Sequence, residues 1–204
     1  MAVRSNKSIF YHVPRTGGMW VKEAMKTAGI EYRDVSPRKW RHPLAPMIHF
    51  THTTPECIAE KYKKGLYSFC FVRQPVDWYR SYWCINLKLK SRGRTKLDEL
   101  LRKPFEEWVN DVLNKYPDGY VSQLYKYFVF DVDYVGSYYR LQDDLVTALN
   151  NAGETFDLQL LLGTPPVNTA ASEKEYSAKA NATQATYDRI IETERWAVDF
   201  VSSL

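Results

Sequence analysis

The N-terminal segment constrains the fold most, because a strand, a glycine loop and a helix follow one another there without a break. Residues 8–13, Ser-Ile-Phe-Tyr-His-Val, are largely β-branched and aromatic and predict a buried strand. Residues 14–18, Pro-Arg-Thr-Gly-Gly, predict a tight loop. Residues 19–28 carry apolar side chains at helical spacing and predict a helix that stops at Gly29.

The same succession of strand and helix recurs twice along the chain. Residues 67–72, Tyr-Ser-Phe-Cys-Phe-Val, are apolar on both faces, as in the strands of a parallel sheet that helices cover. Pro75 ends this strand, and a helix is predicted over 77–90. A short strand over 133–136 precedes a helix over 141–150. This alternation predicts an α/β fold of three layers, α/β/α, around a central parallel sheet.

Other segments are predicted outside this alternation. We expect a helix over 55–62, a helix over 97–116 with an interruption near Pro104, an amphipathic helix over 182–201, and a short strand over 47–50. The chain has 204 residues, of which 45% are hydrophobic and 25% charged, and it contains no long linker. We therefore expect one domain over residues 1–204.

The charged residues are distributed unevenly. The net charge is +4, but the first 103 residues hold 21 of the 28 Lys and Arg and 8 of the 24 Asp and Glu, a balance of +13. The remaining residues therefore carry −9. One interpretation is an anionic partner, such as nucleic acid, a phosphate-bearing cofactor or an acidic polymer. The other is that the two halves neutralise each other across the fold.

Cysteine usage and hydropathy predict a cytoplasmic protein. Cys57, Cys70 and Cys84 contain no C-x-x-C pair, so we expect neither a zinc site nor a redox motif. Cys70 lies in an apolar run and is expected to be a buried small side chain. No apolar run approaches the length of a membrane span, and the first residues do not resemble a secretion signal. Reduced thiols are the expectation.

The loop after the first strand has the features of an anion site. Backbone N–H groups and a helix N-terminus converge there, and Gly17 and Gly18 let the backbone approach a phosphate. Arg15 adds a guanidinium and Thr16 a hydroxyl. The loop is neither a Walker A sequence nor Gly-x-Gly-x-x-Gly. The alternative interpretation is an ordinary turn between a strand and a helix.

A second candidate anion site follows the strand over 67–72. Arg73 stands at its C-terminal end, where ligands bind in open α/β sheets. Ser81 lies eight residues further on, and the bend at Pro75 could bring its hydroxyl and the Arg73 guanidinium to one anion. Arg80 could contribute in the same way. The alternative is an arginine that holds a loop and a serine on a helix surface.

Together these segments resemble the sulfotransferases that use 3′-phosphoadenylyl sulfate (PAPS). Residues 13–20 are similar to that family's Pro-Lys/Arg-Ser/Thr-Gly-x-Thr loop, and residues 71–83 to its Val-Arg-x-Pro-x-Asp-x-x-x-Ser-Tyr segment. Residues 52–58, His-Thr-Thr-Pro-Glu-Cys-Ile, resemble a short His-containing segment of the carbohydrate-type members. Residues 133–145 resemble the family's later Val-Gly segment. The resemblance covers most of the chain and implies the P-loop NTPase-like sulfotransferase fold.

The resemblance also implies which residues bind the nucleotide: Arg15, Thr16, Gly17, Gly18, Met19, Trp20, Arg73, Ser81 and Tyr138. Arg15 matches the loop cation that holds the 5′-phosphosulfate. Arg73 and Ser81 match the pair that binds the 3′-phosphate. Trp20 and Tyr138 match positions that contact adenine.

Four residues depart from the family's pattern, among them Gln74, where Asn is frequent, and Arg140, where Glu is common. Met19 stands where Thr or Ser is usual, and Trp78 stands where Arg is frequent. The missing hydroxyl at Met19 removes one expected contact with the 5′-phosphate. These departures bear on individual contacts more than on the resemblance to the family.

Sulfuryl transfer to a hydroxyl needs a base within hydrogen-bond reach of the acceptor. The resemblance implies His52 for this role, with His49 in reserve, while His12 in the first strand is expected to be packed. Arg15 would stabilise the charge that develops on the leaving phosphate oxygen. The expected catalytic residues are thus His52, Arg15 and His49, and no metal is expected.

The expected activity is transfer of a sulfuryl group from PAPS to an acceptor hydroxyl on a carbohydrate by in-line displacement, with adenosine 3′,5′-bisphosphate (PAP) as product. A nucleotide kinase or another nucleoside-phosphate-binding enzyme of similar fold is the alternative. A nucleic-acid-binding protein is weaker, because the aromatic residues follow strand and helix patterns. Neither a nucleic acid nor a membrane is expected as partner. The basic residues of 88–103 could attract an anionic glycan or form a solvated helix end.

Overall fold

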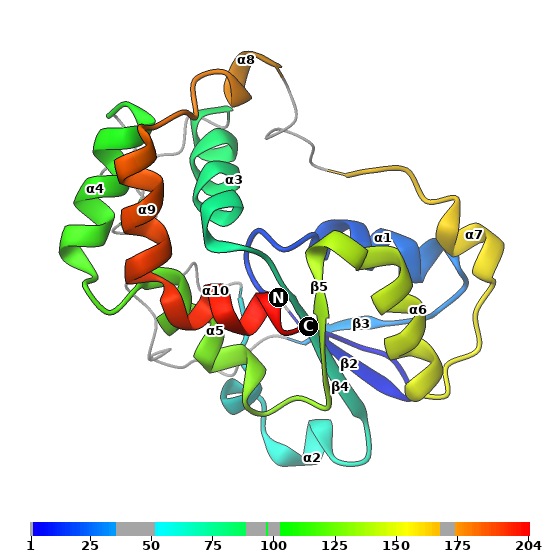
Figure 1. The fold of residues 1–204 in the computed structure, drawn as a ribbon. Helices are drawn as coiled ribbons and strands as arrows, with labels where there is room; N and C mark the ends of the chain where they lie inside the picture. The colour runs from blue at the N-terminus through cyan, green and yellow to red at the C-terminus, as the bar shows by residue number, and fades with distance from the viewer. Residues whose placement is uncertain (1, 36–51, 89–96, 98–102, 168–173) are drawn as a thin grey trace.

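The computed structural model describes residues 2–35, 52–88, 97, 103–167 and 174–204 (Figure 1). Across these ranges the chain forms one sheet of order β3-β1-β2-β4-β5. The strands are β1 (Ala2–Arg4), β2 (Ser8–Tyr11), β3 (Arg33–Val35), β4 (Tyr67–Val72) and β5 (Tyr134–Ser137). The strand predicted over 47–50 lies outside the described residues.

The expected central parallel sheet is found in part, because the sheet also contains antiparallel pairs. Strands β2, β4 and β5 run parallel to one another, but β1 pairs antiparallel with both β2 and β3. The reason is the short connection between β1 and β2, because three residues can join only antiparallel neighbours. Ser5 closes this turn, since its hydroxyl accepts the N–H of Ser8 at 2.8 Å.

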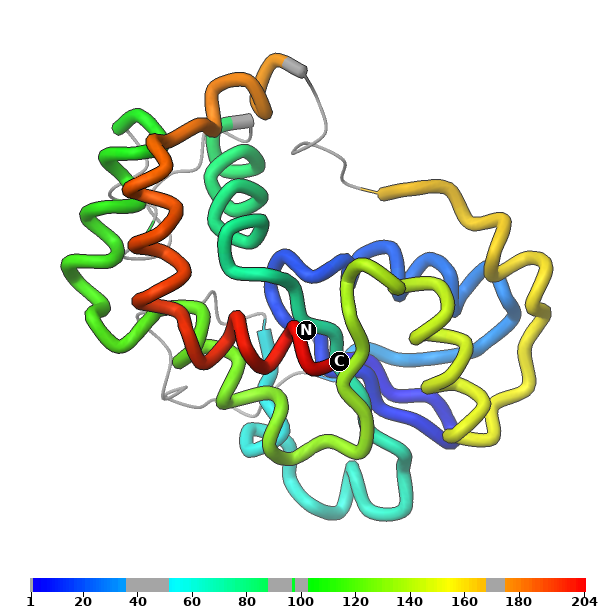
Figure 2. The backbone as a smooth tube through the Cα atoms, viewed as in Figure 1, coloured from blue at the N-terminus to red at the C-terminus, as the bar shows by residue number. Residues whose placement is uncertain are grey.

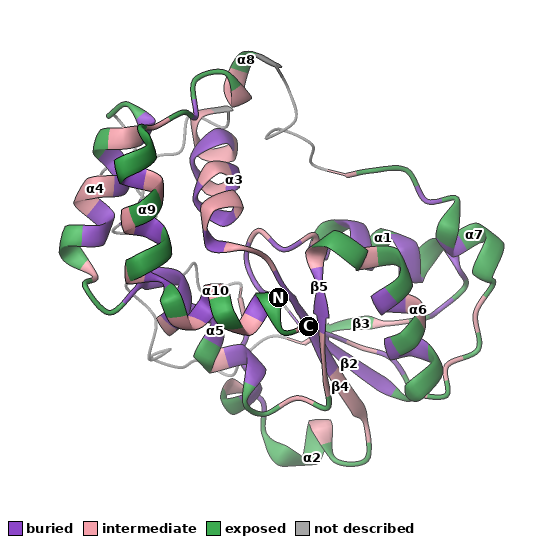
Figure 3. Ribbon diagram, in the orientation of Figure 1, coloured by how far each residue is buried: buried purple, intermediate pink, exposed green. Residues whose placement is uncertain are grey.

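Helices cover both faces of the sheet and give three layers (Figure 1). Phe69 and Phe71 of β4 pack with α1 (Gly18–Thr27) and α6 (Leu141–Asn151). The alternating residues Cys70 and Val72 pack on the opposite face with α3 (Pro75–Lys88) and α5 (Tyr120–Val129). Figure 3 shows the central strands as largely buried ribbons. A strand with both faces covered must be apolar throughout, as the sequence of β4 is.

The remaining elements complete the two outer layers. Helices α4 (Phe105–Lys115), α9 (Gln184–Thr193) and α10 (Arg195–Ser202) lie on the α3 and α5 side, whereas α7 (Leu158–Leu162) contacts α1. Two short helices are α2 (Glu60–Lys63) and α8 (Lys174–Ser177). Within the described ranges, none of the helices has the length and apolar character needed to cross a membrane.

Two helices predicted as continuous are broken. The segment 55–62 forms a 3-10 helix, η1 (Pro55–Cys57), and then α2, because Ile58 adopts an extended conformation and inserts its side chain into the core. The segment 182–201 forms α9 and α10, and the backbone turns between them at Glu194 (Figure 2). The helices predicted over 19–28, 77–90 and 141–150 are confirmed, the second as far as Lys88.

Glu194 explains the break between α9 and α10. Its side chain is fully buried, and its carboxylate accepts the N–H groups of Val121 and Ser122 at 2.9 and 2.7 Å. The hydroxyl groups of Ser122 and Tyr79 also donate to it. The carboxylate therefore caps the N-terminus of α5. Gly119 leaves the space for it, because a Cβ there would lie 2.5 Å from Oε2 of Glu194.

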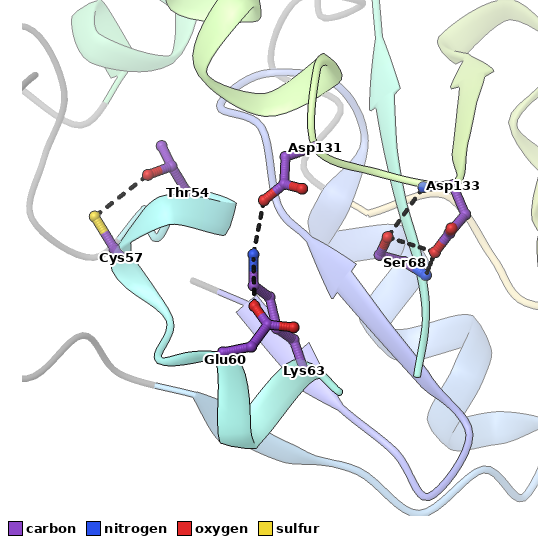
Figure 4. Close-up of polar contacts among 7 residues, drawn as sticks. All are labelled: Thr54, Cys57, Glu60, Lys63, Ser68, Asp131 and Asp133. Carbon is purple, nitrogen blue, oxygen red and sulfur yellow. Dashed lines mark hydrogen bonds and ion pairs between the residues drawn. The ribbon is translucent and has the colours of Figure 1, made fainter. Parts of the chain in front are cut away.

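Polar contacts join the connections at the edge where the parallel strands begin (Figure 4). Lys63 forms ion pairs with Asp131 at 2.7 Å and Glu60 at 3.4 Å. The hydroxyl and the N–H of Ser68 both donate to Asp133 at 2.7 Å. These contacts bind α2 to the connection between α5 and β5, and the start of β5 to β4. The opposite edge of the sheet, where the same strands end, holds the candidate site.

Candidate functional site

A cavity of about 980 Å³ lies at the C-terminal ends of β2, β4 and β5. There the chain enters α1, α3 and, after a short 3-10 helix η3 (Tyr138–Arg140), α6 (Figure 1). Eight of the nine residues predicted to bind a nucleotide line this cavity, together with His52: Arg15, Gly17, Gly18, Met19, Trp20, Arg73, Ser81 and Tyr138. Residues from segments far apart in the sequence thus meet at one place. His49 lies outside the described residues.

The glycine loop is held by two hydrogen bonds to its own backbone. The indole N–H of Trp78 donates to the carbonyl of Pro14 at 2.8 Å, and the hydroxyl of Thr16 donates to the carbonyl of Val13 at 2.9 Å. Thr16 is fully buried and does not line the cavity, so its side chain shapes the loop. Arg15 has a φ of 65°, which is rare for a residue with a side chain. The two bonds flank this unusual residue and keep it in place.

Both glycines of the loop are required by close neighbours. A Cβ on Gly18 would lie 2.0 Å from Cδ2 of His12, and a Cβ on Gly17 would lie 2.6 Å from Cδ2 of Leu141. Helix α1 begins directly after this loop, with neither a side-chain cap nor an acidic residue in its first turn. Its first N–H groups are therefore available to an anion.

The other two helices that begin at the cavity carry carboxylates in their first turns. Asp77 of α3 accepts a hydrogen bond from the hydroxyl of Tyr139, and Asp144 of α6 accepts the N–H of Ser137 at 2.6 Å. Neither carboxylate lines the cavity, and the described lining residues include no Asp or Glu. Of the three helix N-termini, that of α1 has the field best suited to an anion.

Arg15 and Ser81 are in direct contact. The guanidinium donates to the Ser81 hydroxyl from Nε at 3.1 Å and from Nη2 at 2.8 Å. Burial, and secondly the neighbouring charge of Arg73, lower the pKa of Arg15 to about 10. Arg15 therefore remains charged at neutral pH, although its environment disfavours that charge. A bound anion would stabilise the charged guanidinium and raise its pKa again.

Arg73 is the second guanidinium of the cavity. Its central carbon lies 4.1 Å from the centre of the Tyr138 ring, a cation–π contact. Its Nε is buried and has no hydrogen-bond partner among the described residues. A buried donor without an acceptor is costly unless a ligand supplies one. Two guanidinium groups and no carboxylate among the described lining residues give the cavity a positive field that favours anions.

The hydrogen bond of His52 determines its tautomer. Nδ1 of His52 lies 3.0 Å from the carbonyl oxygen of His12, and a carbonyl oxygen can only accept. Nδ1 therefore carries the proton, and in the neutral imidazole the lone pair is on Nε2. Thr53 and Thr54, which follow His52, are fully buried and fix this segment. Figure 4 shows the contact of Thr54 with Cys57 at 3.3 Å.

His12 is buried, as the sequence predicted, but it also lines the cavity. Its ring lies 5.1 Å from that of His52 at an angle of 77°. Burial and, secondly, the neighbouring His52 hold the pKa of His12 well below its usual value. The His12 imidazole is therefore neutral at physiological pH. The proximity of the two histidines had no signal in the sequence, because 40 residues separate them.

The apolar part of the cavity comes from α1, α6 and residues 162–167. Trp20 is largely buried, and its indole N–H donates to the carbonyl of Thr164 at 3.1 Å. This bond joins α1 to the segment 162–167, which sequence reasoning did not assign to the site. Tyr138 and Leu141 line the cavity from the α6 side. Such a mixed apolar and aromatic wall beside cationic groups suits a nucleoside phosphate.

Two further residues have their positions settled by the structure. Arg80 does not line the cavity, so the suggestion that it shares an anion with Arg73 finds no support. Cys70 is fully buried, as predicted, and burial raises the pKa of its thiol.

Among the residues that the structure describes, no group of three His, Cys, Asp or Glu side chains could hold a metal ion.

Comparisons of the chain with protein-family models, with curated proteins and with solved structures find no match.

Proposed function

We propose that this protein is a sulfotransferase that transfers a sulfuryl group from PAPS to an acceptor hydroxyl. The observation that carries the proposal is the meeting of Arg15, Arg73, Ser81 and His52 around one cavity without a lining carboxylate among the described residues. The loop and strand motifs that contain these residues resemble those of PAPS-dependent sulfotransferases. On this proposal the observed α/β architecture is the sulfotransferase variant of the P-loop NTPase-like fold.

On this proposal, the cavity holds the two anionic groups of the nucleotide at separate places. Arg15 and the N-terminus of α1 would hold the 5′-phosphosulfate. Arg73, whose buried Nε has no acceptor among the described residues, would hold the 3′-phosphate. The Ser81 hydroxyl, which the resemblance pairs with Arg73, accepts hydrogen bonds from Arg15 instead. Tyr138 and Trp20 would border the adenine. A cavity of about 980 Å³ leaves room for an acceptor beside the nucleotide.

PAPS supplies an activated sulfuryl group when bound. The acceptor oxygen attacks the sulfur in line, and the bond between sulfur and the bridging phosphate oxygen breaks. Nε2 of His52 takes the proton of the acceptor hydroxyl, because the bond from Nδ1 to the His12 carbonyl leaves the lone pair on Nε2. The guanidinium of Arg15 stabilises the negative charge left on the phosphate oxygen. His49 is the alternative base.

A carbohydrate hydroxyl is the proposed acceptor, because residues 52–58 resemble the His-containing segment of the carbohydrate-type members. An anionic glycan would also give a partner to the basic residues of 88–103. A nucleotide kinase remains the alternative function. It would use a different loop and carboxylates that hold magnesium, whereas the described cavity lining contains two arginines and no carboxylate.

Ligand binding and sulfate transfer test the proposal together. PAP at about 100 times its dissociation constant should add about 2.7 kcal/mol to the free energy of unfolding and raise the melting temperature accordingly. Transfer of radiolabelled sulfate from PAPS should then be screened over glycans, phenols and alcohols. Magnesium-dependent binding of ATP in preference to PAP would support the kinase instead, and no shift with millimolar PAP would exclude the sulfotransferase.

A further inference from the structure

Tyr125 of α5 holds the backbone of Arg73 from the core. Its hydroxyl donates to the carbonyl of Arg73 at 2.7 Å and accepts the N–H of Arg73 at 3.1 Å. Arg73 lies between the last residue of β4 and the first residue of α3, outside both elements. Its N–H and carbonyl groups therefore form their hydrogen bonds with the Tyr125 side chain and not with the backbone of a strand or helix. Tyr125 itself is fully buried in a helix, so this support is rigid.

The side chain of Arg73 is also restrained at its far end. The guanidinium rests on the ring of Tyr138, and its buried Nε has no acceptor among the described residues. The backbone of Arg73 is held by Tyr125 and its guanidinium by Tyr138. The direction in which the Nε–H group points is therefore fixed before any ligand binds. Such preorganisation lowers the entropy cost of binding, which is large for an arginine.

Arg15 is supported by different contacts. The Ser81 hydroxyl accepts two hydrogen bonds from the Arg15 guanidinium, and the indole N–H of Trp78 donates to the carbonyl of Pro14, the preceding residue. Among the contacts of the described residues, those that hold Arg15 do not involve Tyr125. The two cationic arms of the cavity therefore have separate supports, one from α3 and the other from α5. Removing one support should weaken the binding of one anionic group of the ligand and leave the binding of the other unchanged.

We infer that Tyr125 is a positioning residue that makes the cavity select nucleotides with a second phosphate, by fixing the backbone of Arg73. This inference rests on the proposed function, because it assigns the 3′-phosphate to Arg73. Tyr125 itself is not among the described residues that line the cavity. The selected ligand class is a nucleoside 3′,5′-bisphosphate, in preference to a nucleoside 5′-monophosphate.

The test compares two ligands on three proteins. Isothermal titration calorimetry measures the affinity for PAP and for adenosine 5′-monophosphate in the wild type, Tyr125→Phe and Tyr79→Phe. In Tyr125→Phe the affinity for PAP should fall about tenfold, while that for the monophosphate stays within about twofold. Tyr79→Phe is the matched control, since it also removes a buried, hydrogen-bonded hydroxyl, one that donates to Glu194 at 2.6 Å. In Tyr79→Phe the ratio of the affinity for PAP to that for adenosine 5′-monophosphate should equal the ratio in the wild type.

The ratio of affinities separates positioning from a loss of stability. Partial unfolding of a variant lowers both affinities by the same factor, so it cancels in the ratio. In an Arg73→Ala background, Tyr125→Phe should have no further effect on the ratio. An unchanged ratio in Tyr125→Phe alone would overturn the inference and leave the proposed function intact. A wild type that binds neither ligand would instead overturn the proposed function, and the inference with it.

Discussion

The guanidinium of Arg15 points two donors at one acceptor, the hydroxyl of Ser81, at 3.1 and 2.8 Å. The contact joins the glycine loop to α3 across 66 residues of sequence. Because Arg15 also has a φ of 65°, its side chain leaves the loop in a direction that an ordinary backbone would not give. Ser81 thus fixes where the positive charge of the loop stands.

A double-mutant cycle tests how Ser81 acts. Ser81→Ala should lower the affinity for PAP about tenfold, because Arg15 loses the hydroxyl that accepts two of its hydrogen bonds and gains freedom to move. In the Arg15→Ala background the same substitution should cost much less, a coupling of about 1 kcal/mol between the two residues. Calorimetry measures the four affinities. Arg80→Ala, next to Ser81 but outside the cavity lining, is the control and should bind PAP like the wild type. Additive effects at Arg15 and Ser81 would contradict a coupled pair.

His52→Asn should abolish most of the catalysis and leave nucleotide binding intact. The asparagine amide can still donate to the carbonyl of His12, so the local structure is retained. It cannot accept the proton of the acceptor, and loss of a general base typically costs about 100- to 10,000-fold in kcat. Sulfate transfer under saturating PAPS measures kcat, and calorimetry measures the affinity for PAP. Activity at the wild-type level would transfer the role of base to another residue, with His49 first in line.

Trp78→Phe should loosen the glycine loop. It removes the indole N–H that donates to the carbonyl of Pro14 at 2.8 Å while keeping an aromatic ring in the core. We expect a loss of about 1 kcal/mol in the free energy of unfolding and, in addition, a weaker affinity for PAP. Trp108→Phe is the matched control, because the buried indole of Trp108 also donates to a backbone carbonyl, that of Leu97 at 3.3 Å. It should lose similar stability but keep the affinity. Equal affinities in the two variants would show that Trp78 serves packing alone.

These contacts also show what the sequence could and could not reveal. The strand over 8–13, the loop over 14–18 and the helix over 19–28 follow from local apolar spacing and glycine, so they could be predicted. Arg73 could be predicted because it stands directly after an unmistakable strand. In both cases the signal is contained in a few consecutive residues.

The supports of the site are carried by partners distant in sequence. Trp78 and Tyr125 are aromatic residues in helices, where core packing explains them without any polar role. Only the fold shows that their polar tips reach Pro14 and Arg73, 64 and 52 residues away. Glu194 misled the prediction of the last helix, because a glutamate in an amphipathic segment is expected at the surface. Its burial depends on the N-terminus of α5, which helix periodicity in the last segment cannot indicate.

The pH dependence of stability should carry the signature of His12. Burial and the neighbouring His52 hold its folded-state pKa well below 6.5, while the unfolded chain titrates near the ordinary value. Above this value both states are neutral, and His12 gives no pH dependence. As the pH falls below 6.5, His12 is protonated in the unfolded state but stays neutral in the folded state. The free energy of unfolding should therefore decrease, by up to about 1.4 kcal/mol per pH unit.

Urea unfolding between about pH 8 and pH 5 measures this effect in the wild type and in His12→Asn. The substitution removes the titration whatever it does to the stability at neutral pH, and the other titrating groups contribute equally to both proteins. Above pH 6.5 the difference in unfolding free energy between the two proteins should stay constant. Below pH 6.5 the unfolding free energy of the wild type should fall more steeply than that of His12→Asn. Parallel curves down to pH 5 would mean that His12 accepts a proton in the folded state. The buried imidazole against Gly18 would then be a cation at low pH, and the field around Arg15 would be more positive than its contacts imply.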